Sequence, residues 1–158
     1  SGNALSETNA VGELCVRGPQ VMSGYWKSEV SGLDENNWFM TGDIARIDET
    51  GNIFIVDRKK DMIIVSGFNV FPNEVEAVVN EHPSVLECGC VGIEGEDSQE
   101  LVKVFIVLHD GQSASEDEII DFCREKLTAY KVPKHIEFIN EIPKTNVGKV
   151  LRRELKEN

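Results

Sequence analysis

A chain of 158 residues has the length of one ordinary domain, or of a small domain with part of a neighbour. Its hydrophobic content of 41% supports a buried core, but no apolar run approaches the roughly 20 residues that span a bilayer, and no signal peptide opens the chain. A net charge of −12 argues against nucleic acid as a partner, because that surface needs positive potential.

The first third of the chain is predicted to be all-β. Residues 13–17 are typical of a strand, and residues 44–57 of a β-hairpin that turns at residues 49–52. Between them, residues 18–37 are rich in Gly, Ser, Asn and acidic side chains, which favours a loop. This region is too short to bury a core alone, so we expect it to be the edge of a larger domain.

From Asp61 onward, strands alternate with helices. Pro72 suits the first position of a helix that stops at His82, and Ser115 with Glu118 forms a capping box for a second helix. Further strands are expected at residues 62–65, 85–93, 101–108 and 135–139, with an acidic turn at 94–100 and a short terminal helix at 149–156.

This order predicts an α+β fold, a small mixed domain with a short sheet packed by helices. A β-rich fragment of a larger domain precedes it. The predicted boundary falls near Lys60, which gives one region at residues 1–59 and a second at residues 60–158.

The four cysteines show neither a CxxC pair nor zinc-ligand spacing with the histidines, so no metal site is predicted. Cys88 and Cys90 lie two apart in an apolar run and therefore share one strand face. Free cysteine is among the most buried residue types, which favours core packing and a reducing cytoplasm. Positive side chains are frequent between residues 124 and 156, where they form either a solvated face or a local anion site.

Two features of the first region have chemical potential. In Thr41-Gly42-Asp43, an aspartate beside a glycine in a tight loop can present both carboxylate oxygens to a vicinal diol, although it can equally cap a turn. The fixed donors of the Arg58 guanidinium suit ribose oxygens or a phosphate, and they equally suit a surface ion pair with Asp57 or Asp61.

The stretch from Asp57 to Glu76, DRKKDMIIVSGFNVFPNEVE, joins a basic triplet, a strand, a glycine loop and a helix start. This order resembles the hinge motif of adenylate-forming enzymes: acyl-CoA synthetases, peptide-synthetase adenylation domains and luciferases. The likeness runs from about Val11 to Leu155. The stretches VDRKKDMIIVSGFNVFPNEVE, LTAYKVPK and PKTNVGKVLRREL are similar to the bacterial long-chain fatty acid–CoA ligases.

The resemblance assigns Asp43 and Arg58 to the nucleotide and Lys60 to the hinge, where the backbone must adopt two conformations while the side chain stays solvated. Ser66, Gly67 and Phe68 form the loop that lines the CoA channel in related enzymes.

Lys149 in PKTNVGK occupies the position of the catalytic adenylation lysine, a cation able to bridge the acyl carboxylate and the α-phosphate. Arg152 and Arg153 are expected to be surface charges, with assistance to a CoA phosphate as the alternative.

The implied substrates are a fatty acid, ATP and CoA, with Mg²⁺ bound by an N-terminal part that this chain lacks. We therefore expect a C-terminal piece of the ligase, inactive alone, in the cytoplasm or peripheral at the inner membrane face. Another acyl or aryl acid–CoA ligase, a peptide-synthetase adenylation domain and a non-catalytic interaction module remain as alternatives.

Overall fold

The computed structural model describes residues 4–5, 7–26, 32–95 and 99–157. It divides the chain into two compact units, Ser1–Lys60 and Asp61–Asn158. Residues 27–31 of the predicted loop and residues 96–98 of the predicted acidic turn lie outside the described part.

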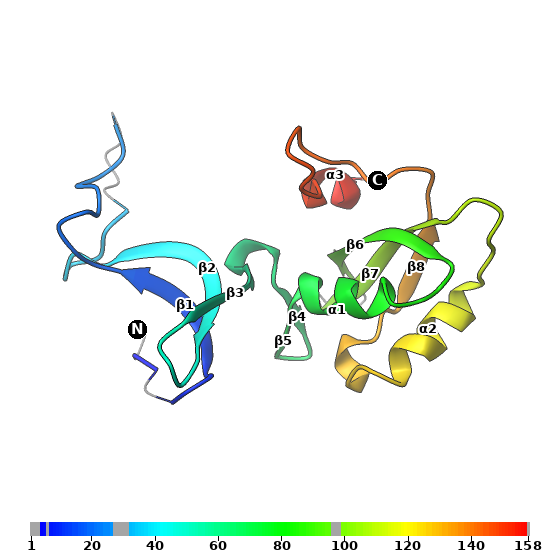
Figure 1. The fold of residues 1–158 in the computed structure, drawn as a ribbon, viewed down its shortest axis with the longest axis horizontal. Coiled ribbons are helices and arrows are strands. Elements are labelled where there is room, and N and C mark those ends of the chain that lie inside the picture. Colours follow the sequence, from blue (N-terminus) through cyan, green and yellow to red (C-terminus); the bar gives the residue numbers. More distant parts are fainter. Residues whose placement is uncertain (1–3, 6, 27–31, 96–98, 158) are drawn as a thin grey trace. The chain divides into compact units, whose positions relative to one another are not determined.

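The first unit is a three-stranded antiparallel sheet in the order β1-β2-β3 (Figure 1). Its strands are β1 Val11–Val16, β2 Phe39–Ile47 and β3 Ile53–Arg58, which confirms the predicted hairpin although β2 starts earlier. At the β2–β3 turn, hydrogen bonds from the Thr50 hydroxyl and from Asn52 lower the pKa of Asp48 to about 2.

Few side chains of the first unit are buried. Among its described residues, Ile44 and Ala45 are the only buried hydrophobic residues. Large apolar side chains of β3 are instead exposed, namely Ile53, Phe54 and Ile55. This sheet therefore lacks a core of its own in the described residues, as expected from its length.

The second unit is built on a three-stranded sheet in the order β6-β7-β8, so that β6 is an edge strand. β6 and β7 are antiparallel, and β8 runs parallel to β7. The bounds of the elements are β4 Ile63–Val65, β5 Phe68–Val70, α1 Pro72–Val79, β6 Val85–Glu94, β7 Glu100–Leu108, α2 Glu116–Arg124, β8 His135–Phe138 and α3 Arg152–Glu157.

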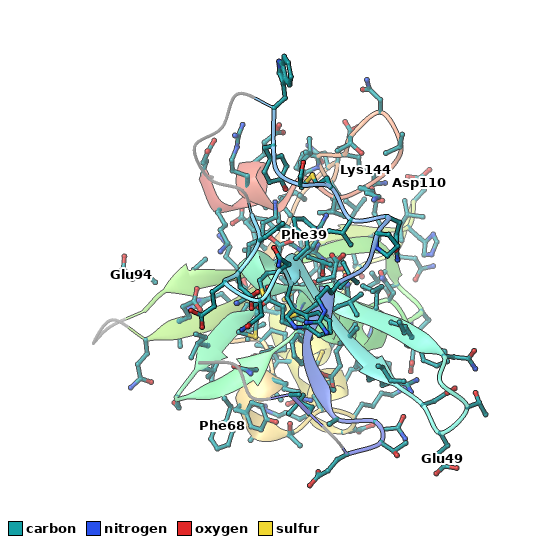
Figure 2. All side chains as sticks on the ribbon, turned by 90° about the vertical axis from the view of Figure 1, so that its left-hand side faces the viewer. Phe39, Glu49, Phe68, Glu94, Asp110 and Lys144 are labelled. Atoms are coloured by element: carbon teal, nitrogen blue, oxygen red, sulfur yellow. The ribbon has the colours of Figure 1, made fainter. Side chains whose placement is uncertain are left out.

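Both faces of this sheet are covered (Figure 1). Because side chains alternate along a strand, Val102, Val104 and Ile106 of β7 pack with α1 and α2 in one cluster, whereas Phe105 and Val107 pack with Leu155 of α3 in another. The α+β fold class predicted from the sequence is confirmed. Figure 2 shows all described side chains, with Phe68 and Lys144 labelled.

Gly89 of β6 makes room for the C-terminal segment. A Cβ atom at this position would lie 2.6 Å from Leu155 Cδ1 and 3.3 Å from Val150 Cγ1, closer than ordinary van der Waals contact. The absence of a side chain therefore lets α3 and the strand-like segment before it sit directly on the sheet.

The helix starts confirm the predicted local signals. Pro72 lies in the first turn of α1, and Ser115 and Glu118 form both hydrogen bonds of a capping box on α2. Hydrogen bonds that the Glu118 carboxylate accepts from Ser115 lower the pKa of Glu118, and the bond from the Ser115 backbone N–H has the larger effect. The terminal helix α3 begins at Arg152 rather than at Lys149, because residues 144–150 form a narrow turn.

The cysteines of the second unit are buried, as predicted. Cys88 and Cys90 both belong to the cluster beneath α1 and α2, together with Cys123 of α2. Burial raises the pKa of the Cys88 thiol and raises that of Cys123 to about 11. These thiols therefore act as small apolar side chains rather than as nucleophiles.

Candidate functional site

Thr41, Gly42 and Asp43 form a bulge inside β2 rather than the predicted tight loop. Residues Met40 and Ile44 pair with Cys15 and Glu13 of β1, so three residues of β2 face one residue of β1. The prediction of a loop was wrong because it missed that the extra residues are absorbed within the strand.

Two local features hold the bulge. Gly42 has a φ of +73°, a conformation that favours glycine. The Thr41 hydroxyl donates to the Leu14 carbonyl oxygen at 2.8 Å and accepts the Asp43 N–H at 3.1 Å. The Asp43 side chain is therefore given a fixed direction by its own backbone.

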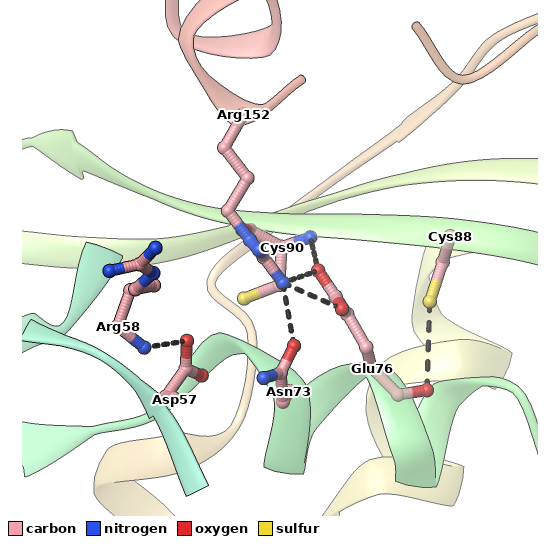
Figure 3. A network of polar contacts seen from close by, with 7 residues as sticks. All are labelled: Asp57, Arg58, Asn73, Glu76, Cys88, Cys90 and Arg152. Carbon is pink, nitrogen blue, oxygen red and sulfur yellow. Dashed lines mark hydrogen bonds and ion pairs between the residues drawn. The ribbon is translucent and has the colours of Figure 1, made fainter. Parts of the chain in front are cut away.

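The structure brings Asp43 and Arg58 together. They are direct partners across β2 and β3, and Arg58 Nε lies 3.0 Å from Asp43 Oδ1. Arg58 thus pairs with Asp43, not with Asp61, while its backbone N–H donates to Asp57 Oδ1 (Figure 3). Both side chains retain solvent exposure, so a carboxylate and a guanidinium are presented side by side to any ligand of this sheet.

Lys60 lies in a short 3-10 helix, Lys59–Asp61, and it is the last residue of the first unit. The residue before it is tied to the sheet, because Lys59 Nζ lies 2.6 Å from Glu13 Oε2. Lys60 is exposed and has no ion-pair partner among the residues that the structure describes. The sequence did not predict the Lys59–Glu13 pair.

Ser66 and Gly67 form the two-residue turn of the hairpin β4–β5, with φ values of 50° and 84°. Two positive φ values are typical of the turn that matches the strand twist. The sequence analysis placed Phe68 in the loop with Ser66 and Gly67, which was wrong, because the turn directly joins two strands and Phe68 is the first residue of β5. A Cβ at Gly67 would meet no atom within 4 Å, so the turn is open to solvent.

Phe68 follows the turn and stacks on Tyr130, with ring centroids 4.7 Å apart. Lys131, the next residue, lies 2.6 Å from Glu74 at the start of α1. The stacking contact holds the turn end of the hairpin against the 3-10 turn Ala129–Lys131, and the ion pair ties that turn to α1. The resemblance singled out Phe68 but not Tyr130, and the spacing of residues in the sequence did not predict that the two rings stack.

Lys149 lies on a narrow excursion between Pro143 and Leu151. The Thr145 N–H donates to the Lys149 carbonyl oxygen at 2.8 Å, and Gly148, with a φ of +80°, completes the turn. The Lys149 side chain is exposed, and its ammonium has no ion-pair partner in the described part of the chain. The turn therefore presents a cation that is not neutralised locally.

Most positive side chains between residues 124 and 156 are paired with carboxylates. The paired cations are Arg124, Lys126, Lys131, Lys144, Arg152 and Arg153. Within the described residues, Lys149 is thus one of few cations of this region left free for an anion.

Arg152 is not a surface charge. Its side chain is 16% exposed and donates to both carboxylate oxygens of Glu76 at 2.8 Å and to Asn73 Oδ1 at 2.9 Å (Figure 3). The prediction was wrong because Asn73 and Glu76 lie three residues apart on one face of α1 and enclose the guanidinium. The spacing of Asn73 and Glu76 in the sequence was the one signal that could have indicated a buried cationic partner. Arg153 is 86% exposed, as predicted.

Within residues 4–5, 7–26, 32–95 and 99–157, no group of three His, Cys, Asp or Glu side chains is arranged to hold a metal ion. None of the described helices is both long and apolar enough to cross a membrane.

Residues 74–149 match the family model of the AMP-binding enzyme C-terminal domain. The matched segment begins inside α1 and includes the three-stranded sheet, α2 and Lys149. The resemblance to adenylate-forming enzymes predicted from the sequence is therefore confirmed.

Among curated proteins, the chain is 57% identical over 148 residues to the long-chain-fatty-acid–CoA ligase of Escherichia coli O157:H7. It is 46% identical over 148 residues to the ligase of the same name from Bacillus subtilis strain 168. Each match covers 92% of this chain and 26% of the relative, so the chain spans about a quarter of the length of these relatives.

Solved structures agree with these matches. ATP-bound MatB from Rhodopseudomonas palustris superimposes with a TM-score of 0.89 at 32% identity, over 96% of this chain and 31% of that one. The o-succinylbenzoate CoA synthetase MenE of Bacillus subtilis, in complex with its acyl-adenylate, gives a TM-score of 0.83 at 35% identity over the same shares.

Proposed function

We propose that the chain is the C-terminal part of an ATP-dependent long-chain fatty acid–CoA ligase. In the first step a carboxylate oxygen of the fatty acid bonds to the α-phosphorus of ATP and pyrophosphate leaves. In the second, the CoA sulfur bonds to the acyl carbon, the thiol proton is released and AMP leaves. The observation that carries this proposal is the 57% identity with the Escherichia coli ligase over 148 residues.

In this proposal, residues 1–59 are the β-rich end of the large adenylation domain, and Asp43 and Arg58 bind the nucleotide. The pair suits a ribose diol, because Asp43 Oδ1 accepts the Arg58 Nε–H while the other carboxylate oxygen can accept from a hydroxyl group. Arg58 keeps its charge at any working pH and compensates the added negative charge of a nucleotide. The bulge at Thr41 and Gly42 supports this role by fixing the direction of Asp43.

Residues 60–158 act as the mobile C-terminal domain, which turns about Lys60 between the two steps. The tie between Lys59 and Glu13 ends one residue before Lys60, which supports a pivot at that position. Ser66, Gly67 and Phe68 serve the thiolation step, since a side-chain-free turn lets the pantetheine arm approach the backbone. One domain thus serves two reactions in turn, as closing domains do in other enzymes.

Lys149 acts in the adenylation step. Negative charge accumulates on the transferring phosphoryl group and on the attacking carboxylate, and an ammonium with no local partner stabilises that charge. Loss of one such contact typically costs about 3–4 kcal/mol of transition-state stabilisation, or about 100- to 1,000-fold in kcat.

The test is Lys149→Ala in the full-length ligase, with Lys156→Ala as the matched control because Lys156 is an exposed lysine on the adjoining helix α3. We expect adenylation, measured as pyrophosphate release, to fall about 100- to 1,000-fold while thioester formation from supplied acyl-adenylate is retained. Lys156→Ala should leave both steps unchanged. Equal loss of both steps in Lys149→Ala would contradict the role.

A second candidate is a ligase for another acid, since the chain is also 44% identical over 147 residues to the 2-succinylbenzoate–CoA ligase of Geobacillus kaustophilus. Kinetics of the full-length enzyme with fatty acids of different length and with aryl acids decide between the two. The proposal further includes Mg²⁺ held outside this chain, and a cytoplasmic enzyme with peripheral association at the inner membrane face.

A further inference from the structure

Arg152 is the centre of a nearly buried polar network in the second unit (Figure 3). Its side chain is 16% exposed and that of its partner Glu76 is 13% exposed. The guanidinium donates to Glu76 and Asn73 on α1, and its Nε–H donates to the Cys90 carbonyl oxygen at 3.2 Å. Because its charge is already matched by Glu76, Arg152 is poorly suited to bind a phosphate itself.

The network also provides hydrogen-bond partners for one backbone N–H and one carbonyl oxygen at the edge of the sheet. β6 is an edge strand, so its outward backbone groups lack strand partners. At Cys90 the N–H donates to Glu76 Oε1 at 2.8 Å and the carbonyl oxygen accepts from Arg152. The first residue of α3 is thereby fastened to α1 and to β6 at the same point.

This joint lies three residues after Lys149. Before the Lys149 excursion, the chain is fixed by Ile142, which is buried beneath the sheet. The two ends meet at the hydrogen bond from the Leu151 N–H to the Pro143 carbonyl oxygen, at 2.8 Å. Past this bond, Arg152 is the first residue whose side chain forms several polar contacts with other elements. Together with the packing of Val150 and Leu155 on the sheet, these contacts fix where the C-terminal arm of the excursion returns.

We infer that Arg152 is a positioning residue for Lys149 in the adenylation step, an inference that rests on the proposed function. Arg152 touches no reacting atom in this account. It fixes the start of α3, and through the two intervening residues, Val150 and Leu151, it fixes the place from which the Lys149 ammonium extends. Electrostatic stabilisation of a transition state depends on such fixed geometry, and a displacement of about 1 Å can cost about 100-fold in rate.

The experiment compares Arg152→Met with Arg153→Met in the full-length ligase. Arg153 is the ideal control because it is the next residue of the same helix, has the same chemistry and is 86% exposed. For Arg152→Met we expect kcat for pyrophosphate release to fall by about 100-fold, with the KM for ATP and the thiolation rate from supplied acyl-adenylate unchanged. Arg153→Met should match the unmodified enzyme in all three.

Two further variants separate positioning from folding. Because Arg152→Met removes the guanidinium that balances the Glu76 carboxylate charge, the double variant Arg152→Met/Glu76→Gln removes that charge as well and should show the same adenylation defect at a higher melting temperature. Arg152→Lys keeps one charged donor and should restore part of the adenylation rate. Unchanged adenylation, or equal losses in both half-reactions that follow the melting temperature, would overturn the inference.

Lys149→Ala distinguishes this inference from the proposed function. A large adenylation defect in Lys149→Ala with normal adenylation in Arg152→Met would overturn the positioning role and leave the proposed function standing. Normal adenylation in Lys149→Ala would overturn the proposed role of that lysine, and the positioning role of Arg152 with it.

Discussion

The two units of the chain hold their structure by different means. Residues 61–158 contain two clusters of buried side chains, one on each face of the sheet β6-β7-β8. The described residues of 1–60 bury only Ile44 and Ala45 among their hydrophobic side chains and are ordered by strand pairing and by hydrogen bonds at turns. From this difference we expect the second unit to fold as an independent domain and the first to depend on further protein.

The proposed functional groups follow the same division. Asp43 and Arg58 are directed by backbone features of a sheet, namely a bulge and a cross-strand pair. Lys149 and Gly67 lie on turns whose flanking segments contribute buried side chains to the core, Ile142 and Leu155 on either side of Lys149 and Ile63 and Val70 on either side of Gly67. Three experiments can break or sharpen this comparison.

The largest expected difference is in autonomous folding. Expressed separately, residues 61–158 should unfold cooperatively with a free energy of about 5–15 kcal/mol, the usual range for a domain with its own core. Residues 1–60 should show no cooperative transition, because the apolar area they bury does not offset the chain entropy. Denaturant titration followed by circular dichroism measures both. A cooperative transition in residues 1–60 would refute the proposed dependence.

Gly67→Leu tests whether the hairpin turn serves chemistry independently of the core. Gly111→Leu is the matched control, since both glycines have positive φ, +84° and +73°, and neither has an atom within 4 Å of a built Cβ. Both variants should lose a similar stability, about 1–2 kcal/mol, from the backbone strain.

In the full-length ligase, only Gly67→Leu should slow thiolation from supplied acyl-adenylate, by about tenfold or more, because a bulky side chain then blocks the pantetheine approach. Adenylation should stay within a factor of two of the control. Identical thiolation rates in the two variants would remove Gly67 from the proposed channel.

The smallest expected effect concerns the capping box of α2. Since hydrogen bonds from Ser115 lower the folded-state pKa of Glu118 below its unfolded value, its stabilising contribution is present above the unfolded pKa and is lost as the pH falls through the folded pKa. Glu118→Gln keeps an acceptor but no charge, so residues 61–158 with this change should lose less stability between about pH 5 and pH 3 than the unmodified segment.

Denaturant midpoints at several pH values measure this difference. Glu116→Gln is the control, because Glu116 lies in the same first turn and takes no part in the capping box. Parallel pH dependence of the Glu118 variant and the unmodified segment would contradict the assignment.

Local signals in the sequence predicted much of the fold. The proline at residue 72 and the Ser115–Glu118 spacing each determine a helix start through short-range geometry, and both helices begin there. A strand was predicted at residues 101–108, and the structure places β7 at the centre of its sheet. Motif resemblance identified the family, which the comparisons confirm, and it selected candidate site residues that remain proposals.

What the sequence could not predict depends on contacts between distant residues. The bulge at Asp43 exists only because β1 pairs with β2, and the burial of Arg152 only because α1 places Asn73 and Glu76 over the edge of β6. Likewise, whether Phe68 is in a loop or a strand is decided by pairing with Val65, which short apolar segments do not specify.

Gly89 has a consequence for exchanging C-terminal segments between related proteins. The tail from Ile142 to Leu155 packs against Gly89, a residue of β6 without a side chain. Close packing therefore depends on both the tail and the strand. In a recipient with alanine or a larger residue at the position of Gly89, the new side chain would displace the incoming tail from the sheet. That displacement would also move Lys149, which the tail carries. Chimeras at this junction should therefore retain the glycine of the strand together with the tail.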